Sequence, residues 1–97
     1  MSSTKEILDC GKRLDIAQLE SWYLQSLKVL LSGQPVRIEV SQLQKIDTAA
    51  LQLLYQFYQQ ALQDGIEVEW SEMSESFREA VSLSGLSFTA DRQVLRE

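Results

Sequence analysis

The chain has 97 residues, a formal net charge of −5 and 44% hydrophobic residues. This length suits one domain with one core, and we assign residues 1–97 to it. The acidic balance, with basic residues scattered along the chain, provides no stripe for a phosphate backbone and excludes nucleic acid as a partner. Because the chain has no histidine, it lacks the commonest general base and metal ligand. The sequence therefore predicts no enzyme activity, no metal and no cofactor.

The lengths of the apolar runs and the single cysteine indicate the cellular compartment of the protein. The longest uninterrupted apolar run, residues 29–31, is far shorter than a membrane span, and the first residues lack the apolar segment of a secretory signal. We expect a cytoplasmic protein without direct membrane insertion. Cys10 has no partner for an internal disulfide, so we expect a buried or half-buried thiol.

The first predicted elements are a short strand over residues 6–9 and a helix over residues 17–31. Asp15 precedes this helix as an N-cap candidate, and Gly33 stands where a C-cap belongs. The helical spacing predicts a core-facing side made of Leu19, Tyr23, Leu24, Leu27, Leu30 and Leu31.

The middle of the chain changes from a strand period to a helical period across one polar turn, residues 41–48, which we call the elbow. Before it, apolar residues alternate with polar ones over residues 36–40; after it, a helix is predicted over residues 48–63. The residues expected to face the core are Ala50, Leu54, Phe57 and Ala61, flanked by Leu51, Tyr58 and Leu62. A second alternating strand follows over residues 66–70.

Strand, helix and strand with short connections predict a parallel pair. Both strands have one apolar and one charged face, so we expect helices on only one side of the sheet. A third helix is predicted over residues 74–84, with Met73, Phe77, Ala80 and Val81 inward and Gly85 as its stop. The segment 86–97, with Phe88, Val94 and Leu95, is expected to add a final short strand or an edge segment.

At the elbow the sequence resembles the STAS domain family, named for sulfate transporters and anti-sigma-factor antagonists. The family pattern is a strand ending in Asp-Leu-Ser, five residues, then Asp-Ser-Ser-Gly-Leu opening a helix. The matching stretches here are Glu39-Val40-Ser41 and Asp47-Thr48-Ala49-Ala50-Leu51, with the spacing preserved. Further likeness covers Leu14-Asp15-Ile16, the Asp64-Gly65 turn and Ser84-Gly85-Leu86, so that the resemblance spans roughly residues 5 to 90.

The resemblance implies an α/β fold, with a mixed four-to-five-stranded sheet and helices packed on one face, and no catalytic activity. It also implies a partner-binding surface at the elbow and the start of the next helix, formed by Ser41, Asp47, Thr48, Ala49, Ala50 and Gln52. In family members that switch partners, a kinase that is also the anti-sigma factor phosphorylates the second hydroxyl residue of the motif. Here that position is Ala49, and the usual Gly is Ala50. Thr48 is the only hydroxyl left, so regulation by phosphorylation is either lost or has moved to it.

Several residues allow a functional and a purely structural interpretation. Asp47 and Thr48 suit docking, but both are also ordinary N-cap residues. The outward face of the predicted second helix is neutral, which suits an interface, although glutamine is also simply a good helix former. This face consists of Gln52, Gln56, Gln59, Gln60 and Gln63.

The tryptophans and the acidic residues also allow both a functional and a structural interpretation. Trp70 is expected in the core, whereas Trp22, at the edge of the apolar face of its helix, is open between core and binding platform. The carboxylates of Glu67, Glu69, Glu72 and Glu75 are expected to form a solvated face rather than a cation site.

The sequence therefore predicts a non-enzymatic interaction module of the anti-sigma-factor-antagonist type, whose partner is an anti-sigma kinase or another signalling protein. This partner is expected to bind the strand-to-helix turn at residues 47–52, without the usual phosphorylation switch. The alternative is an accessory STAS subunit of a bacterial lipid-transport ABC system, whose partner is a transporter ATPase. Such STAS proteins use the same helix, and a Thr at the position of Thr48 fits them.

Overall fold

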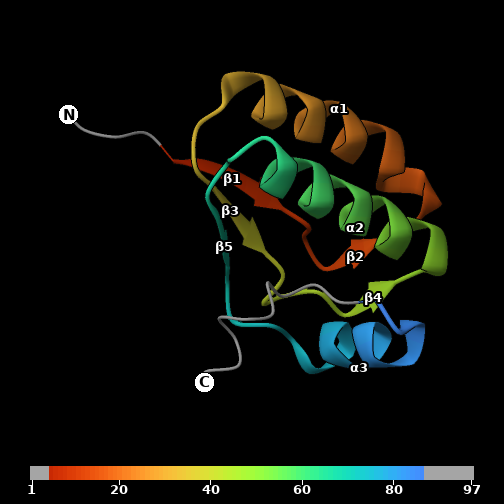
Figure 1. Cartoon of the computed structure of the whole chain (residues 1–97). Helices are drawn as coiled ribbons and strands as arrows, with labels where there is room; N and C mark the ends of the chain where they lie inside the picture. Colours follow the sequence, from red (N-terminus) through yellow and green to blue (C-terminus); the bar gives the residue numbers. More distant parts are fainter. Residues whose placement is uncertain (1–4, 87–97) are drawn as a thin grey trace, which may run out of the picture.

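The computed structural model describes residues 5–86. Along the chain, two strands precede each of the first two helices, and a single strand precedes the third helix (Figure 1). The elements are β1 (Glu6–Asp9), β2 (Arg13–Leu14), α1 (Ile16–Ser32), β3 (Val36–Glu39), β4 (Lys45–Ile46), α2 (Thr48–Gln63), β5 (Val68–Trp70) and α3 (Glu75–Ser84). The strand expected within residues 86–97 lies outside the described residues, apart from Leu86.

The main sheet has the strand order β1-β3-β5, with β3 in the centre. Its pairs are parallel, and Val36 and Ile38 stand opposite Val68 and Trp70. This confirms the parallel pair that the strand-helix-strand pattern predicts. The short strands β2 and β4 form a second parallel pair, so every pairing within residues 5–86 is parallel. The α/β fold class is confirmed, with five strands divided between two sheets.

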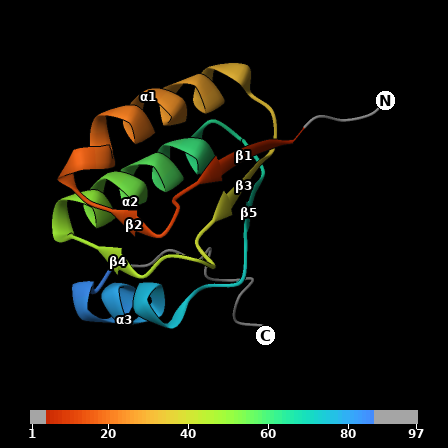
Figure 2. The same ribbon diagram turned by 180° about the vertical axis from the view of Figure 1, so that it is seen from behind.

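Helices α1 and α2 lie side by side across the same face of the main sheet, as Figures 1 and 2 show from opposite sides. This inner face of the sheet is apolar, and Leu8, Val36 and Ile38 are fully buried on it. On the outer face, Arg37 pairs with Glu39 and Glu69, at 2.6 and 2.9 Å, and Lys5 pairs with Glu69. Within the described range the helices cover only one face, as the alternating strands predict.

Helix α1 begins and ends as the sequence predicts, but it buries a different side. Asp15 and Gln18 form a capping box, and Gly33 closes the helix at φ 69°. The buried residues are Trp22, Ser26 and Val29, with Leu19 and Leu30 packed against them. The predicted inward residues Tyr23, Leu24, Leu27 and Leu31 are instead 45%, 55%, 37% and 87% exposed.

The physical reason is that α1 carries apolar residues around most of its circumference, so periodicity alone does not select the buried face. The large indole of Trp22 packs edge-on against Phe57 of α2, with ring centroids 6.0 Å apart. Ser26 fits beside it because its own hydroxyl is satisfied by donating to the carbonyl of Tyr23 at 2.7 Å.

Helices α2 and α3 bury the predicted sides. The buried residues of α2 are Ala50, Leu51, Leu54, Phe57, Tyr58 and Ala61, while Leu62 is 42% exposed. In α3 Phe77 is fully buried, and Met73, Ala80 and Val81 pack against the core. Gly85 ends α3 at φ 77°, a left-handed conformation that favours glycine.

Candidate protein-docking site

The elbow runs from the end of β3 to the start of α2 and is held to the body of the protein from two sides. On one side β4 pairs with β2, and the amide of Asp47 donates to the carbonyl of Leu14 at 3.3 Å. On the other side Leu43 is buried and anchors the middle of the segment in the core. The elbow is therefore a fixed platform that presents the first turn of α2.

Asp47 is the N-cap of α2, as the sequence predicts. Its carboxylate accepts from the amide of Ala50 at 3.3 Å, and its carbonyl accepts from the amide of Leu51 at 2.9 Å. Thr48 is the first helical residue and not the cap, and no hydrogen bond of its hydroxyl is found within residues 5–86. The capping interpretation thus holds for Asp47 alone, and the hydroxyl of Thr48 is free for another role.

The first turn of α2 separates the predicted site residues by exposure. Asp47, Thr48, Ala49 and Gln52 are exposed and contiguous, and we call them the α2 entry surface. Ala50 is 0% exposed, because its small side chain faces the core and lets the helix lie close to the strands. Its side chain is therefore inaccessible to a partner, and Ala50 does not belong to this surface.

Ser41 lies at the other end of the elbow in a different environment. It is half-buried and lines a depression of about 590 Å³ together with Gln42 and with residues at the start of α3. This depression is lined by the charged residues Glu72, Glu75 and Arg78, whereas Asp47 is the one charged residue of the α2 entry surface. The structure places Ser41 apart from the α2 entry surface.

Two serines that sequence analysis missed hold the elbow from the side of α3. The hydroxyl of Ser71 accepts from the amide of Val40 at 2.8 Å and is buried. The hydroxyl of Ser74 donates to the carbonyl of Leu43 at 2.6 Å and accepts from the amide of Phe77 at 3.1 Å as the cap of α3. The helix start after Ser74 is a signal for its capping role, but no local pattern reveals that Ser71 and Ser74 reach the elbow.

Beyond Asp47, the outward face of α2 is neutral. Gln52, Gln56, Gln59, Gln60 and Gln63 are all exposed, and no charged residue occurs between Thr48 and Gln63. Gln60 donates to Asp64 at 3.0 Å, at the end of the helix away from the elbow. A neutral face loses less solvation free energy on contact than a charged one, so this helix is suited to association.

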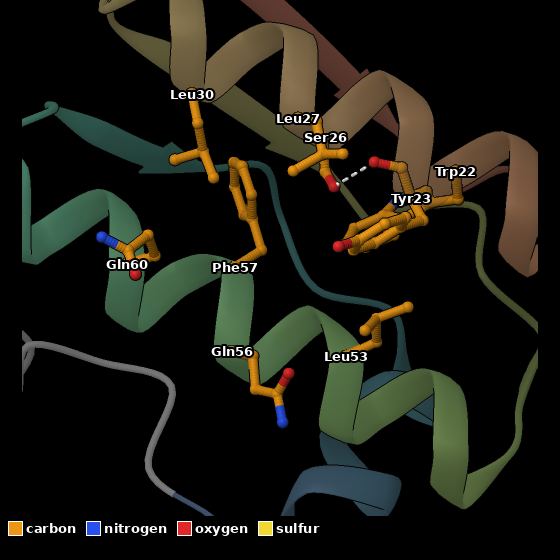
Figure 3. Close-up of a pocket in the computed structure, with 9 residues that line it drawn as sticks. All are labelled: Trp22, Tyr23, Ser26, Leu27, Leu30, Leu53, Gln56, Phe57 and Gln60. Atoms are coloured by element: carbon orange, nitrogen blue, oxygen red, sulfur yellow. Dashed lines mark hydrogen bonds between the residues drawn. The ribbon is translucent and has the colours of Figure 1, made fainter.

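A groove between α1 and α2 adjoins this face and has a volume of about 180 Å³. Trp22 and Phe57 lie between the two helices in Figure 3, with Tyr23 and Leu27 from α1 and Leu53 from α2 around them. Trp22 is 4% exposed, so of the two roles that the sequence allows, core residue and binding platform, it has the core role. Trp70 is half-buried and packs against the core beside Tyr58 and Phe77.

The reactive or metal-binding side chains of the described residues are either buried or far apart. Cys10 is 3% exposed, and burial raises the pKa of its thiol to about 12, an effect that the Trp22 indole opposes only in part. The thiol is therefore protonated and inert near neutral pH. Glu69 is neutralised by Lys5 and Arg37, and the described part of the chain contains no cluster of residues that would hold a metal ion.

No helix within residues 5–86 is long and apolar enough to cross a membrane. Comparison with curated proteins and with solved structures gives no significant match. A family model described as "Mlab, STAS domain" matches residues 5–94. STAS domains are in general protein-interaction modules without enzymatic activity. Because this match covers nearly the whole chain and the fold agrees with it, the protein belongs to the STAS domain family.

Proposed function

We propose that the protein is a non-enzymatic, cytoplasmic interaction module of the anti-sigma-factor-antagonist type, which binds a regulatory protein through the α2 entry surface. The observation that carries this proposal is the contiguous exposure of Asp47, Thr48, Ala49 and Gln52 on a turn whose backbone is fixed from both sides. The partner is an anti-sigma kinase or another signalling protein.

The chemistry of the first turn supports docking there. The amides of Thr48 and Ala49 have no acceptor within a helix, because the first amides of every helix lie ahead of its hydrogen-bond ladder. The methyl side chain of Ala49 leaves room for a partner to approach these amides. An acceptor group of the partner, such as a carbonyl or carboxylate oxygen, also gains from the positive end of the helix dipole.

The same turn argues against the usual phosphorylation switch. Ala49 stands at the position of the family phosphoacceptor and has no hydroxyl. Thr48 is exposed and is the only hydroxyl residue in this turn, so it is the single candidate for a shifted site. We expect no phosphate incorporation at Thr48 or elsewhere on the elbow when the protein is incubated with kinases from its own cell. Modification there would contradict this part of the proposal.

A second candidate is an accessory subunit of a bacterial lipid-transport ABC system. The observation that favours it is the pairing of an exposed Thr48 with Ala49, because STAS proteins of that kind use the same helix and accommodate Thr at this position. Affinity purification from native extract separates the two candidates. Recovery of an ATPase with a permease supports the transport role, whereas recovery of a histidine-kinase-like protein supports the signalling role.

The docking surface itself is tested by substitutions on α2. We expect Gln52→Arg to abolish binding of the recovered partner, because the new charge must be desolvated at the contact. Gln63→Arg is the matched control, since Gln63 is also exposed and lies at the far end of the same helix. Binding by surface plasmon resonance and melting temperature are measured for both. Retained binding by Gln52→Arg, or equal loss in both variants, would refute the α2 entry surface as the docking site.

A further inference from the structure

The side of α1 that points away from the core is solvent-exposed along the length of the helix. Residues that recur along one side of this helix, opposite Trp22, Ser26 and Val29, are all exposed. We call this side the outer α1 face; it consists of Ala17, Glu20, Ser21, Leu24, Leu27, Lys28 and Leu31. Leu24 is at its centre and is 55% exposed.

The two halves of the outer α1 face differ in the size of their side chains. The N-terminal half carries the small residues Ala17 and Ser21, which line a shallow depression of about 440 Å³ together with Glu20, Leu24, Gln25 and Lys28. The C-terminal half carries Leu27 and Leu31, which are 37% and 87% exposed and form a ridge. A hollow and a ridge on one face make that face complementary in shape to itself when it is turned end to end.

The charges have the same symmetry. Glu20 lies one turn before Leu24, and Lys28 lies one turn after it. Eight residues, about 12 Å along the axis, separate these two side chains, so they do not pair within one helix. Neither forms an ion pair with any residue in the described range. Each is therefore an available partner for an opposite charge on another molecule.

We propose that the outer α1 face binds a second copy of this chain, as an antiparallel α1–α1 pair with its two-fold axis at Leu24. In this arrangement the Leu27 and Leu31 ridge of each copy enters the hollow at Ala17 and Ser21 of the other. Glu20 of each copy meets Lys28 of the partner, so both charged groups are paired. A two-fold contact of this kind uses the same surface on both copies and closes at the dimer.

This packing has two further consequences. The apolar surface continues from Leu27 to Tyr23 and to the groove between α1 and α2 (Figure 3), which widens the area that the partner covers. The α2 entry surface at Thr48 and Gln52 is not part of the outer α1 face. The two proposals therefore rest on different residues, and failure of one leaves the other intact.

Sedimentation equilibrium of the full chain tests the proposal. Because a contact between single helices is small, the protein is studied from about 10 µM to about 1 mM. We expect a concentration-dependent species of twice the 11.1 kDa chain mass. Leu24→Glu places two carboxylates on the symmetry axis and is expected to raise the dimer Kd by about a hundredfold. Leu83→Glu is the control, because Leu83 is an exposed leucine on α3.

A charge-reversal cycle tests the antiparallel register. Glu20→Lys and Lys28→Glu each create like-charged pairs across the axis, and each is expected to raise Kd by about threefold to tenfold. The double variant restores opposite charges only between copies, so it is expected to recover the original Kd. Melting curves confirm that all variants fold.

Three results would overturn the proposal. The first is a monomer at every concentration of the unaltered protein. The second is equal weakening by the Leu24 and Leu83 substitutions. The third is a charge-reversal double variant whose Kd stays as high as that of the single variants.

Discussion

Helices α1 and α2 lie on the same face of the sheet, yet they differ in what they leave outside. Helix α2 is apolar on its inner side and carries glutamines on its outer side. Helix α1 buries Trp22, Ser26 and Val29 and leaves four large apolar residues exposed. The comparison shows that apolar spacing identifies a buried side only when the opposite side is polar. In α1 the buried side is chosen by how the Trp22 ring fits against Phe57.

The largest expected effect tests this choice within α1. Trp22→Ala removes a buried indole that contacts Phe57, so we expect a loss of about 3–5 kcal/mol in the free energy of unfolding. Leu31→Ala removes a side chain that is 87% exposed, so we expect a change within about 0.5 kcal/mol. Urea denaturation of both variants gives the comparison. Similar losses in the two variants would mean that α1 buries the side that its leucine spacing suggests.

The next effect concerns the thiol beneath α1. The pKa of Cys10 is raised to about 12 in the folded protein, above its ordinary value of 9.0. The unfolded chain therefore releases this proton first, and stability is full below about pH 9 and falls as the pH rises toward the folded pKa. We expect a loss of about 1–2 kcal/mol between about pH 8 and about pH 10.

Cys10→Ala isolates this contribution, because the variant retains the tyrosines and lysines that also titrate in alkali. The slope of its unfolding free energy against pH is expected to be smaller than that of the unaltered protein by the contribution of the thiol. Equal slopes would show that Cys10 ionises in the folded state as easily as in the unfolded chain.

The N-caps of α1 and α2 also differ, in the number and length of their hydrogen bonds. At α1 the Asp15 carboxylate accepts from Ala17 at 3.0 Å, and Gln18 accepts from the Asp15 amide at 3.1 Å. At α2 the side chain of Asp47 accepts one bond, at 3.3 Å. We expect Asp15→Ala and Asp47→Ala each to cost about 1 kcal/mol, with the larger loss at Asp15. Thermal unfolding measures both.

Thr48→Ala serves as the control for the cap of α2. Because Thr48 follows the cap and its hydroxyl has no hydrogen-bond partner within residues 5–86, we expect its removal to leave the melting temperature unchanged. A loss as large as that of Asp47→Ala would return the capping role to Thr48.

The smallest expected change in stability comes from the ion pairs on the outer face of the sheet. Lys5, followed by Arg37, holds the pKa of Glu69 below its usual range. A lowered folded pKa contributes stability at neutral pH, and this contribution is lost as the pH falls through the folded pKa. We expect Glu69→Gln to flatten the acid limb of the stability curve slightly, because all these groups are solvated. Unfolding curves between about pH 2 and about pH 6 measure it.

The elements and their boundaries were largely predictable because each has a local cause. Asp15, Asp47 and Gly33 mark helix ends by their own hydrogen bonds or backbone angles, and these predictions are confirmed. The exposure of Thr48 and Gln52 also follows from their place on an amphipathic helix. The bonds from Ser71 and Ser74 to the elbow join segments about 31 residues apart in the chain. Long-range bonds of this kind depend on the packed fold, which no local pattern reveals.

The hydroxyl of Ser74 acts as a joint between two parts of the protein. The same oxygen that begins α3 also holds the carbonyl of Leu43. When the elbow moves away from the body, this hydroxyl loses the acceptor that orients it toward the amide of Phe77. The Phe77 amide is therefore expected to lose hydrogen-exchange protection when Leu43 moves, so that a binding event beside α2 is reported by an amide in α3.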